Sequence, residues 1–129
     1  MVLDTSALLA LLLDEPEAEE FRAAVEEDTT RLVSAATLLE TALVIEARKG
    51  ELGGRELDSL IQKAEIAVVA VDAEHVSEAR RAYRRFGKGR HTAGLNFGDV
   101  FSYALARTSG EPLLFKGDDF AKTDIGRVT

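Results

Sequence analysis

Carboxylates recur at four places in this chain, each at the end of an expected strand or in an expected helix. The acids in question are Asp4, Glu40, Asp99 and the adjacent pair Asp118 and Asp119. In an open parallel sheet, ligands collect at the carboxyl ends of the strands, so acids placed there are placed for chemistry. If the fold gathers them, their like charges raise one another's pKa unless a cation lies between them.

The residue types restrict which cation this would be. The chain has no cysteine, and its histidines are only His75 and His91, so an imidazole- or thiolate-rich zinc site is not expected. An all-oxygen site selects Mg²⁺ or Mn²⁺. Such ions commonly hold a phosphodiester, make hydroxide from a bound water and stabilise the leaving oxygen.

Three of these acids also have an ordinary structural explanation. Asp4 can cap the helix that follows it, a role that the Ser6 hydroxyl could also take. Glu40, in the middle of an apolar helix, can form an ion pair at the edge of the buried stripe, because an unpaired buried carboxylate is costly. Asp99 falls in the first turn of a helix, where the helix dipole favours an acid by about 0.3–1 kcal/mol.

The elements that must position these acids alternate between strand and helix. Short apolar strands are expected at 2–3, 31–34, 66–71 and 113–115, and the tail from Gly126 can pair as an edge strand. The run 66–71 is continuously apolar and β-branched, which suits a strand buried on both faces.

Between the strands, apolar residues recur at helical spacing. Helices are expected at 7–13, after Pro16, at 35–49, 55–64, 73–86 and from about 99 to 109. The helix at 35–49 has few polar positions, so most of its circumference is expected to be buried, and Gly50 with Gly53 and Gly54 is expected to end it.

This alternation predicts an α/β fold, a three-layer α/β/α sandwich around a central, mainly parallel sheet of four to five strands. With 129 residues and no linker or repeat, residues 1–129 form a single domain. The early apolar run is too short to span a membrane and lacks the features of a signal peptide, so we expect a cytoplasmic protein without a membrane partner.

The charge is unevenly distributed. The net charge of −7 argues against general, charge-driven binding of nucleic acid. Residues 78–91, however, carry six basic side chains against one acid, Glu78; the basic residues are Arg80, Arg81, Arg84, Arg85, Lys88 and Arg90. This basic strip is either a solvated helix face, a track for an RNA backbone or a dock for an acidic protein segment.

Four motifs together resemble the PIN-domain ribonucleases, and among them the VapC-type toxins of bacterial toxin–antitoxin pairs. They are Val-Leu-Asp-Thr-Ser at 2–6, a Glu on the third helix, Gly-Leu-Asn-Phe-Gly-Asp at 94–99 and Phe-Lys-Gly-Asp-Asp-Phe at 115–120. The resemblance covers essentially the whole chain. It implies a metal-dependent endoribonuclease that cuts structured RNA such as tRNA or rRNA, forms a homodimer and is inhibited by a cognate VapB-type antitoxin.

The resemblance also assigns roles to the residues that match its motifs. Asp4 and Asp99 would be the main ligands of Mg²⁺, which Mn²⁺ can replace. Glu40 would complete the site or orient the attacking water, and either Asp118 or Asp119 would be the fourth acid. Ser6, Asn96 and Thr123 would hydrogen-bond the carboxylates or the substrate phosphate.

Three other interpretations remain open from the residues alone. A Mg²⁺-dependent phosphatase would use Asp4 as its nucleophile, but such enzymes carry a second acid two residues on, where this chain has Ser6. A phosphoacceptor receiver domain would need paired acids early in the chain. A non-catalytic metal-binding interaction module would hold the ion without cleaving RNA.

Overall fold

The strand that opens the chain lies inside a four-stranded parallel sheet. The computed structural model describes residues 1–129, and its strands are β1 (Val2–Leu3), β2 (Leu32–Ser34), β3 (Ala67–Val69) and β4 (Leu113–Leu114). Their order is β3-β2-β1-β4, and every pair is parallel. The tail adds one parallel bridge between Leu113 and Arg127, which confirms the expected edge pairing.

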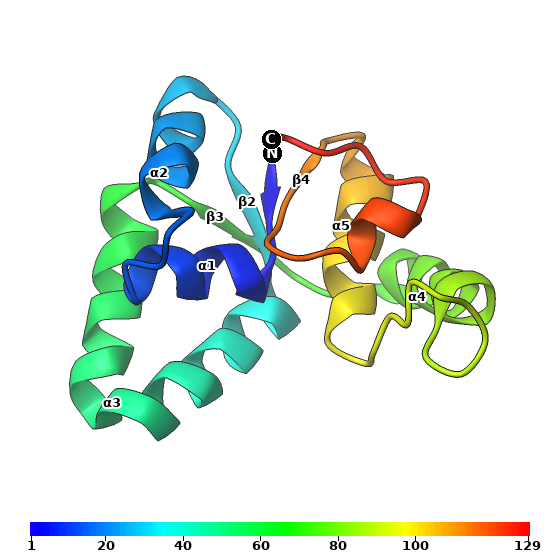
Figure 1. Ribbon diagram of the computed structural model, residues 1–129, viewed down its shortest axis with the longest axis horizontal. Helices are drawn as coiled ribbons and strands as arrows, with labels where there is room; N and C mark the ends of the chain where they lie inside the picture. The colour runs from blue at the N-terminus through cyan, green and yellow to red at the C-terminus, as the bar shows by residue number, and fades with distance from the viewer.

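Helices cover both faces of this sheet, as Figure 1 shows. They are α1 (Thr5–Leu12), α2 (Ala18–Glu27), α3 (Ala35–Lys63), α4 (Ala73–Phe86), α5 (Asp99–Ser109) and the short 3₁₀ helix η1 (Phe120–Lys122). One core packs α1 and α2 against the sheet, and a second packs α4 and α5 against its other face. The predicted three-layer α/β fold is therefore confirmed. None of the helices is both long and apolar enough to cross a membrane.

The third strand differs from the expectation for residues 66–71. β3 is at the edge of the sheet, with β2 as its single neighbour, and Val68 is 48% exposed. Ile66 alone is buried in this run, because it precedes the strand and packs into the core beside α1. The prediction of a strand buried on both faces is wrong, since a β-branched run also suits an edge position.

The long helix α3 also differs. It bends at Gly50, whose φ of 64° only glycine adopts readily, but Gly53 and Gly54 lie inside the second arm rather than at the end of the first. The first arm is not mostly buried, since Leu39 is 61% and Leu43 63% exposed. The spacing of apolar residues therefore predicted that the first arm is helical. The number of apolar residues in it did not predict how much of the arm is buried.

The bend brings the two arms of α3 into close contact at Gly53. A Cβ at this position would lie 2.7 Å from the backbone oxygen of Ile45, whereas a Cβ on Gly54 would meet the flexible side chain of Glu46 at 3.1 Å. Gly53 is thus required by the packing of the two arms, and Gly54 is not.

We predict that Gly53→Ala lowers the free energy of unfolding by about 1–3 kcal/mol, the usual cost of overpacking a rigid contact. Gly54→Ala is the matched control. It should be neutral or stabilise by up to about 1 kcal/mol, because alanine is the better helix former. Urea denaturation of both variants measures the difference, and equal stabilities would contradict the close contact at Ile45.

Candidate active site

Strand β1 delivers Asp4 to the buried start of α1. The carboxylate is only 4% exposed and is the N-cap of the helix, accepting a hydrogen bond from the N–H of Ser6 at 3.1 Å. It also accepts from the hydroxyls of Ser6 and Ser102, both at 2.7 Å. Asp4 is therefore both a helix cap and a member of the acidic group described below. The Ser6 hydroxyl does not cap the helix but donates a hydrogen bond to the Asp4 carboxylate.

Asp99 lies at the start of α5, half-buried, where Asn96 fixes it. The Asn96 N–H donates to the Asp99 carboxylate at 3.0 Å, and the Asp99 N–H donates to the Asn96 side-chain oxygen at 2.9 Å. These reciprocal bonds close the turn before α5 and hold the carboxylate at the helix start. Asn96 thus contacts the acid's carboxylate through its backbone N–H, while its side chain accepts from the backbone of Asp99.

The electrostatic surroundings of Asp99 show which acids lie near it. Burial raises the pKa of its carboxyl to about 6, and the N–H of Asn96 opposes that effect. The charges that raise the pKa further belong to Asp4, Asp119 and Glu40. Of the adjacent pair Asp118 and Asp119, it is Asp119 whose charge is among the largest effects on the pKa of Asp99.

Glu40 reaches this group from the first arm of α3. The Thr5 hydroxyl donates to its Oε1 at 2.7 Å. Its other oxygen lies against the backbone of Gly98, where a Cβ would come within 2.0 Å of Oε2. Gly98 is thus the residue that lets the Glu40 carboxylate approach the start of α5.

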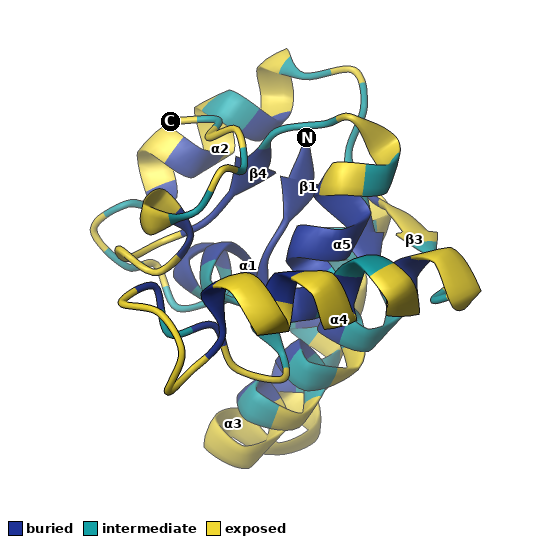
Figure 2. Ribbon diagram, turned by 90° about the vertical axis from the view of Figure 1, so that its right-hand side faces the viewer, coloured by how far each residue is buried: buried dark blue, intermediate teal, exposed yellow.

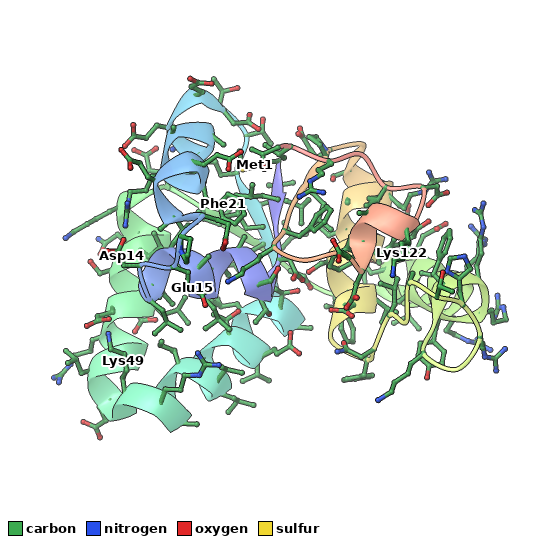
Figure 3. The ribbon with its side chains drawn as sticks, in the orientation of Figure 1. Met1, Asp14, Glu15, Phe21, Lys49 and Lys122 are labelled. Atoms are coloured by element: carbon green, nitrogen blue, oxygen red, sulfur yellow. The ribbon has the colours of Figure 1, made fainter.

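No protein cation neutralises this group, which we call the acidic cluster: Asp4, Glu40, Asp99 and Asp119. None of the four takes part in an ion pair. Lys116, the nearest basic residue in sequence, pairs instead with Glu15 at 3.4 Å and Glu17 at 3.1 Å, on the turn between α1 and α2 where Figure 3 labels Glu15. The cluster is a site of uncompensated negative charge.

The donor set fits a hard divalent cation. The oxygens are all carboxylate or hydroxyl, which suits Mg²⁺ or Mn²⁺. No three of the acids converge closely enough on one point to ligate an ion together. Mg²⁺ does not require this, because it usually keeps several waters and takes one or two carboxylates directly.

Several hydroxyls that sequence reasoning missed support the acids. Thr37 lies 3.1 Å from Ser102, the residue that donates to Asp4, and Thr41 donates to Thr5 at 3.1 Å. Ser102 lies three residues after Asp99, so the two residues share a face of α5. This spacing is the one feature of the sequence that could have indicated a role for Ser102 beside the acids. Which hydroxyl meets which acid depends on how α3 and α5 pack against β1, and spacing does not show that.

The remaining predicted polar residues occupy different positions. The Ser6 hydroxyl donates to Asp4 of the acidic cluster and also accepts from the N–H of Lys116 at 3.0 Å. The Thr123 hydroxyl, by contrast, donates to the Phe120 carbonyl at 2.7 Å and accepts from the Ile125 N–H at 3.2 Å. Thr123 therefore stabilises its own loop, and its hydrogen bonds do not include a carboxylate.

The basic strip is divided between paired and free cations. Arg81 pairs with Glu78 at 2.6 Å and Arg85 with Asp124 at 3.1 Å. The basic residues that are exposed and form no ion pair are Arg80, Arg84, Lys88 and Arg90. They lie on α4 and the loop after it, and Figure 2 shows the exposed side of α4 toward the viewer.

Arg80 and Arg84 also border an apolar groove between α4 and α5. The groove measures about 580 Å³, and its lining includes Val76, Tyr83 and Phe97. Phe97 is 79% exposed and lies two residues before Asp99.

Known proteins are similar to this chain along nearly its whole length. The PIN domain family matches residues 1–126. Ribonuclease VapC30 of Mycobacterium tuberculosis is 64% identical over 128 residues, which cover 99% of this chain and 98% of that protein. Ribonuclease VapC of Mycolicibacterium smegmatis is 61% identical over 128 residues, covering 99% of each.

The fold is shared with a solved structure as well. The crystal structure of Mycobacterium tuberculosis VapC20, described as a sarcin-ricin loop cleaving toxin, matches 96% of this chain and 95% of its own with a TM-score of 0.78. At 18% identity this likeness supports the fold alone. The family follows from the sequence matches: a chain whose PIN match runs from residue 1 to 126, and which is 64% identical to a VapC ribonuclease, belongs to the VapC branch of the PIN-domain family.

Proposed function

We propose that this protein is a Mg²⁺- or Mn²⁺-dependent endoribonuclease, the toxin of a toxin–antitoxin pair, that hydrolyses phosphodiester bonds in structured RNA such as tRNA or rRNA. The observation that carries the proposal is the acidic cluster, in which the charges of three further carboxylates act on Asp99 and no protein cation forms an ion pair with any of the four. The ribonuclease names of the close relatives support the same chemistry.

In this proposal Asp4 and Asp99 hold the ion. A bound divalent ion would lower the pKa of a coordinated water and stabilise the charge on the phosphate. Ser6 and Ser102 fix both oxygens of Asp4, and Asn96 fixes Asp99, so the two carboxylates are oriented before substrate arrives. Glu40, held through Oε1 by Thr5, keeps Oε2 available to orient the attacking water and accept its proton.

The partners follow from surface charge and from family membership. The unpaired Arg80, Arg84, Lys88 and Arg90 would contact the phosphates of the RNA. The apolar groove between α4 and α5 offers the hydrophobic surface that a homodimer needs. A cognate VapB-type antitoxin would inhibit the enzyme by covering the acidic cluster.

We expect the purified protein to cleave RNA with Mg²⁺ or Mn²⁺ and to stop when EDTA is added. Asp99→Asn should lose at least about a hundredfold in rate, more than the usual loss when a group behind a ligand is removed. Its fold should persist, because asparagine has the same volume and relieves repulsion. Asp58→Asn, an exposed acid on α3, is the control.

Other outcomes of this assay would point to the rival functions. Ion binding without RNA cleavage would indicate a metal-binding interaction module. Release of phosphate from monoesters, with RNA intact, would indicate a phosphatase. Cleavage that survives both EDTA and Asp99→Asn would contradict the proposed site.

The raised pKa of Asp99 predicts an unusual pH dependence of stability. Since the folded-state pKa is about 6 and the ordinary value 3.8, the folded protein holds a proton that the unfolded chain has lost. In EDTA, stability should therefore fall as pH rises from about 4 to 6, and Asp99→Asn should lack that slope. Urea unfolding of both proteins across this range measures it. Parallel curves would show that Asp99 has an ordinary pKa.

Gly98→Ala tests the position of Glu40. The backbone of Gly98 has ordinary helical angles, so alanine strains nothing there except the Glu40 carboxylate that its Cβ would strike. We expect about a hundredfold loss of RNA cleavage, the effect of a misplacement near 1 Å, with the melting temperature little changed. Gly126→Ala, with no atom within 3.8 Å of its Cβ, is the matched control. Full activity in Gly98→Ala would mean that Glu40 has no part in the reaction.

A further inference from the structure

The carboxylate that completes the acidic cluster lies on a loop with little regular structure. This loop, residues 116–125, leaves β4, carries Asp118 and Asp119, and contains only the short helix η1. In Figure 1 it is the orange-to-red segment that runs beside α5. Asp119 is exposed and its side chain accepts no capping hydrogen bond, so contacts elsewhere in the loop must determine where it lies.

Repulsion acts against this placement. The charge of Asp119 disfavours the charged form of Asp99, and neither acid forms an ion pair with a protein cation. Without an ion, a mobile loop would move Asp119 away from Asp99. The chain therefore needs attractive contacts that hold the loop against α5.

The far end of the loop carries such contacts at Asp124. The hydroxyl of Tyr103, a buried residue of α5, donates to one carboxylate oxygen of Asp124. The other oxygen lies 3.1 Å from Arg85 of α4 and 3.9 Å from Arg107 of α5. Burial opposes the charge of Asp124, but these donors outweigh it and hold the pKa of the carboxyl below its ordinary value.

The spacing of Asp99 and Tyr103 on α5 matches the order of Asp119 and Asp124 along the loop. Tyr103 lies one helical turn after Asp99, so both project from the same side of α5. Asp124 follows Asp119 along the loop. The charge of Asp119 acts on Asp99, and one helical turn further along α5 the hydroxyl of Tyr103 holds Asp124. The hydrogen bond to Asp124 therefore ties this loop to the helix that carries Asp99.

We propose that Asp124, held by Tyr103, Arg85 and Arg107, is a positioning residue that keeps Asp119 beside Asp99 and so prepares the acidic cluster for its ion. The inference rests on the proposed metal-dependent function. It also gives Arg85 a role other than RNA contact. Lys116, through Ser6, Glu15 and Glu17, anchors the opposite end of the same loop.

The buried ring of Phe120 is a separate anchor, since it packs on Phe115 with the ring centroids 5.3 Å apart. This apolar contact should keep the loop folded when Asp124 is changed. Variants at Asp124 and Tyr103 are therefore expected to loosen the loop without unfolding the protein.

The test measures Mn²⁺ affinity by titration calorimetry on the full-length protein, together with hydrogen–deuterium exchange of residues 117–124 in EDTA. Tyr103→Phe and Asp124→Ala should weaken Mn²⁺ binding by about three- to tenfold, below the usual range for groups that contact a ligand directly. Both should exchange faster in the loop. Asp124→Asn, which keeps the oxygen that accepts from Tyr103, should recover part of the affinity. Asp58→Ala, which removes an exposed acid of α3, is the matched control.

Kinetics separate positioning from general damage. The variants should need more Mg²⁺ for half-maximal cleavage, while their rate at saturating Mg²⁺ stays within about twofold of the unchanged protein, because the bound ion itself attracts Asp119. Unchanged Mn²⁺ affinity with a lowered melting temperature would overturn the proposal and leave Asp124 a structural residue. If the unchanged protein bound no Mn²⁺, the proposed function would fail, and this inference with it.

Discussion

The central constraint on this structure is a group of like charges that no protein cation neutralises. Burial raises the pKa of Asp99 to about 6, and the charges of Asp4, Asp119 and Glu40, which come from separate elements, act in the same direction. A folded chain tolerates such a group only where other contacts hold it, because repulsion and burial both oppose it. The rest of the architecture can be understood as the set of contacts that hold these acids in place.

Those contacts are of two kinds. Hydroxyls satisfy the buried oxygens: Ser6 and Ser102 donate to Asp4, and Thr5 donates to Glu40. The second kind is the close approach of a carboxylate to the backbone: because Gly98 has no side chain, the Glu40 carboxylate can lie at the start of α5. The two cores on opposite faces of the sheet fix α3 and α5 relative to β1, which is what brings these groups together.

Much of this arrangement could be predicted from the sequence, because strand ends and helix starts are local features. The alternation of elements predicted the parallel sheet, and the positions of Asp4 and Asp99 followed from it. Burial was harder to predict. Leu39 and Leu43 are exposed, and Val68 lies on an edge strand, because hydrophobicity alone does not say which side of an element finds a partner.

Contacts between segments that are far apart in the chain could not be predicted from the sequence pattern. Ser102 meets Asp4 across 98 residues of chain, and nothing in their spacing indicates it. Asp118 and Asp119 are adjacent and chemically identical, so only the course of the loop distinguishes them. The glycine pattern predicts a helix end at Gly53, but this residue is the point where the two arms of α3 touch.

The most direct test of the central claim is a crystal structure grown with Mn²⁺, with the anomalous signal of the metal measured. The account predicts a peak about 2.0–2.3 Å from carboxylate oxygens of Asp4 and Asp99, with Glu40 and Asp119 facing the ion directly or through water. A fully occupied metal elsewhere in the molecule, with the acidic cluster empty at millimolar Mn²⁺, would contradict it.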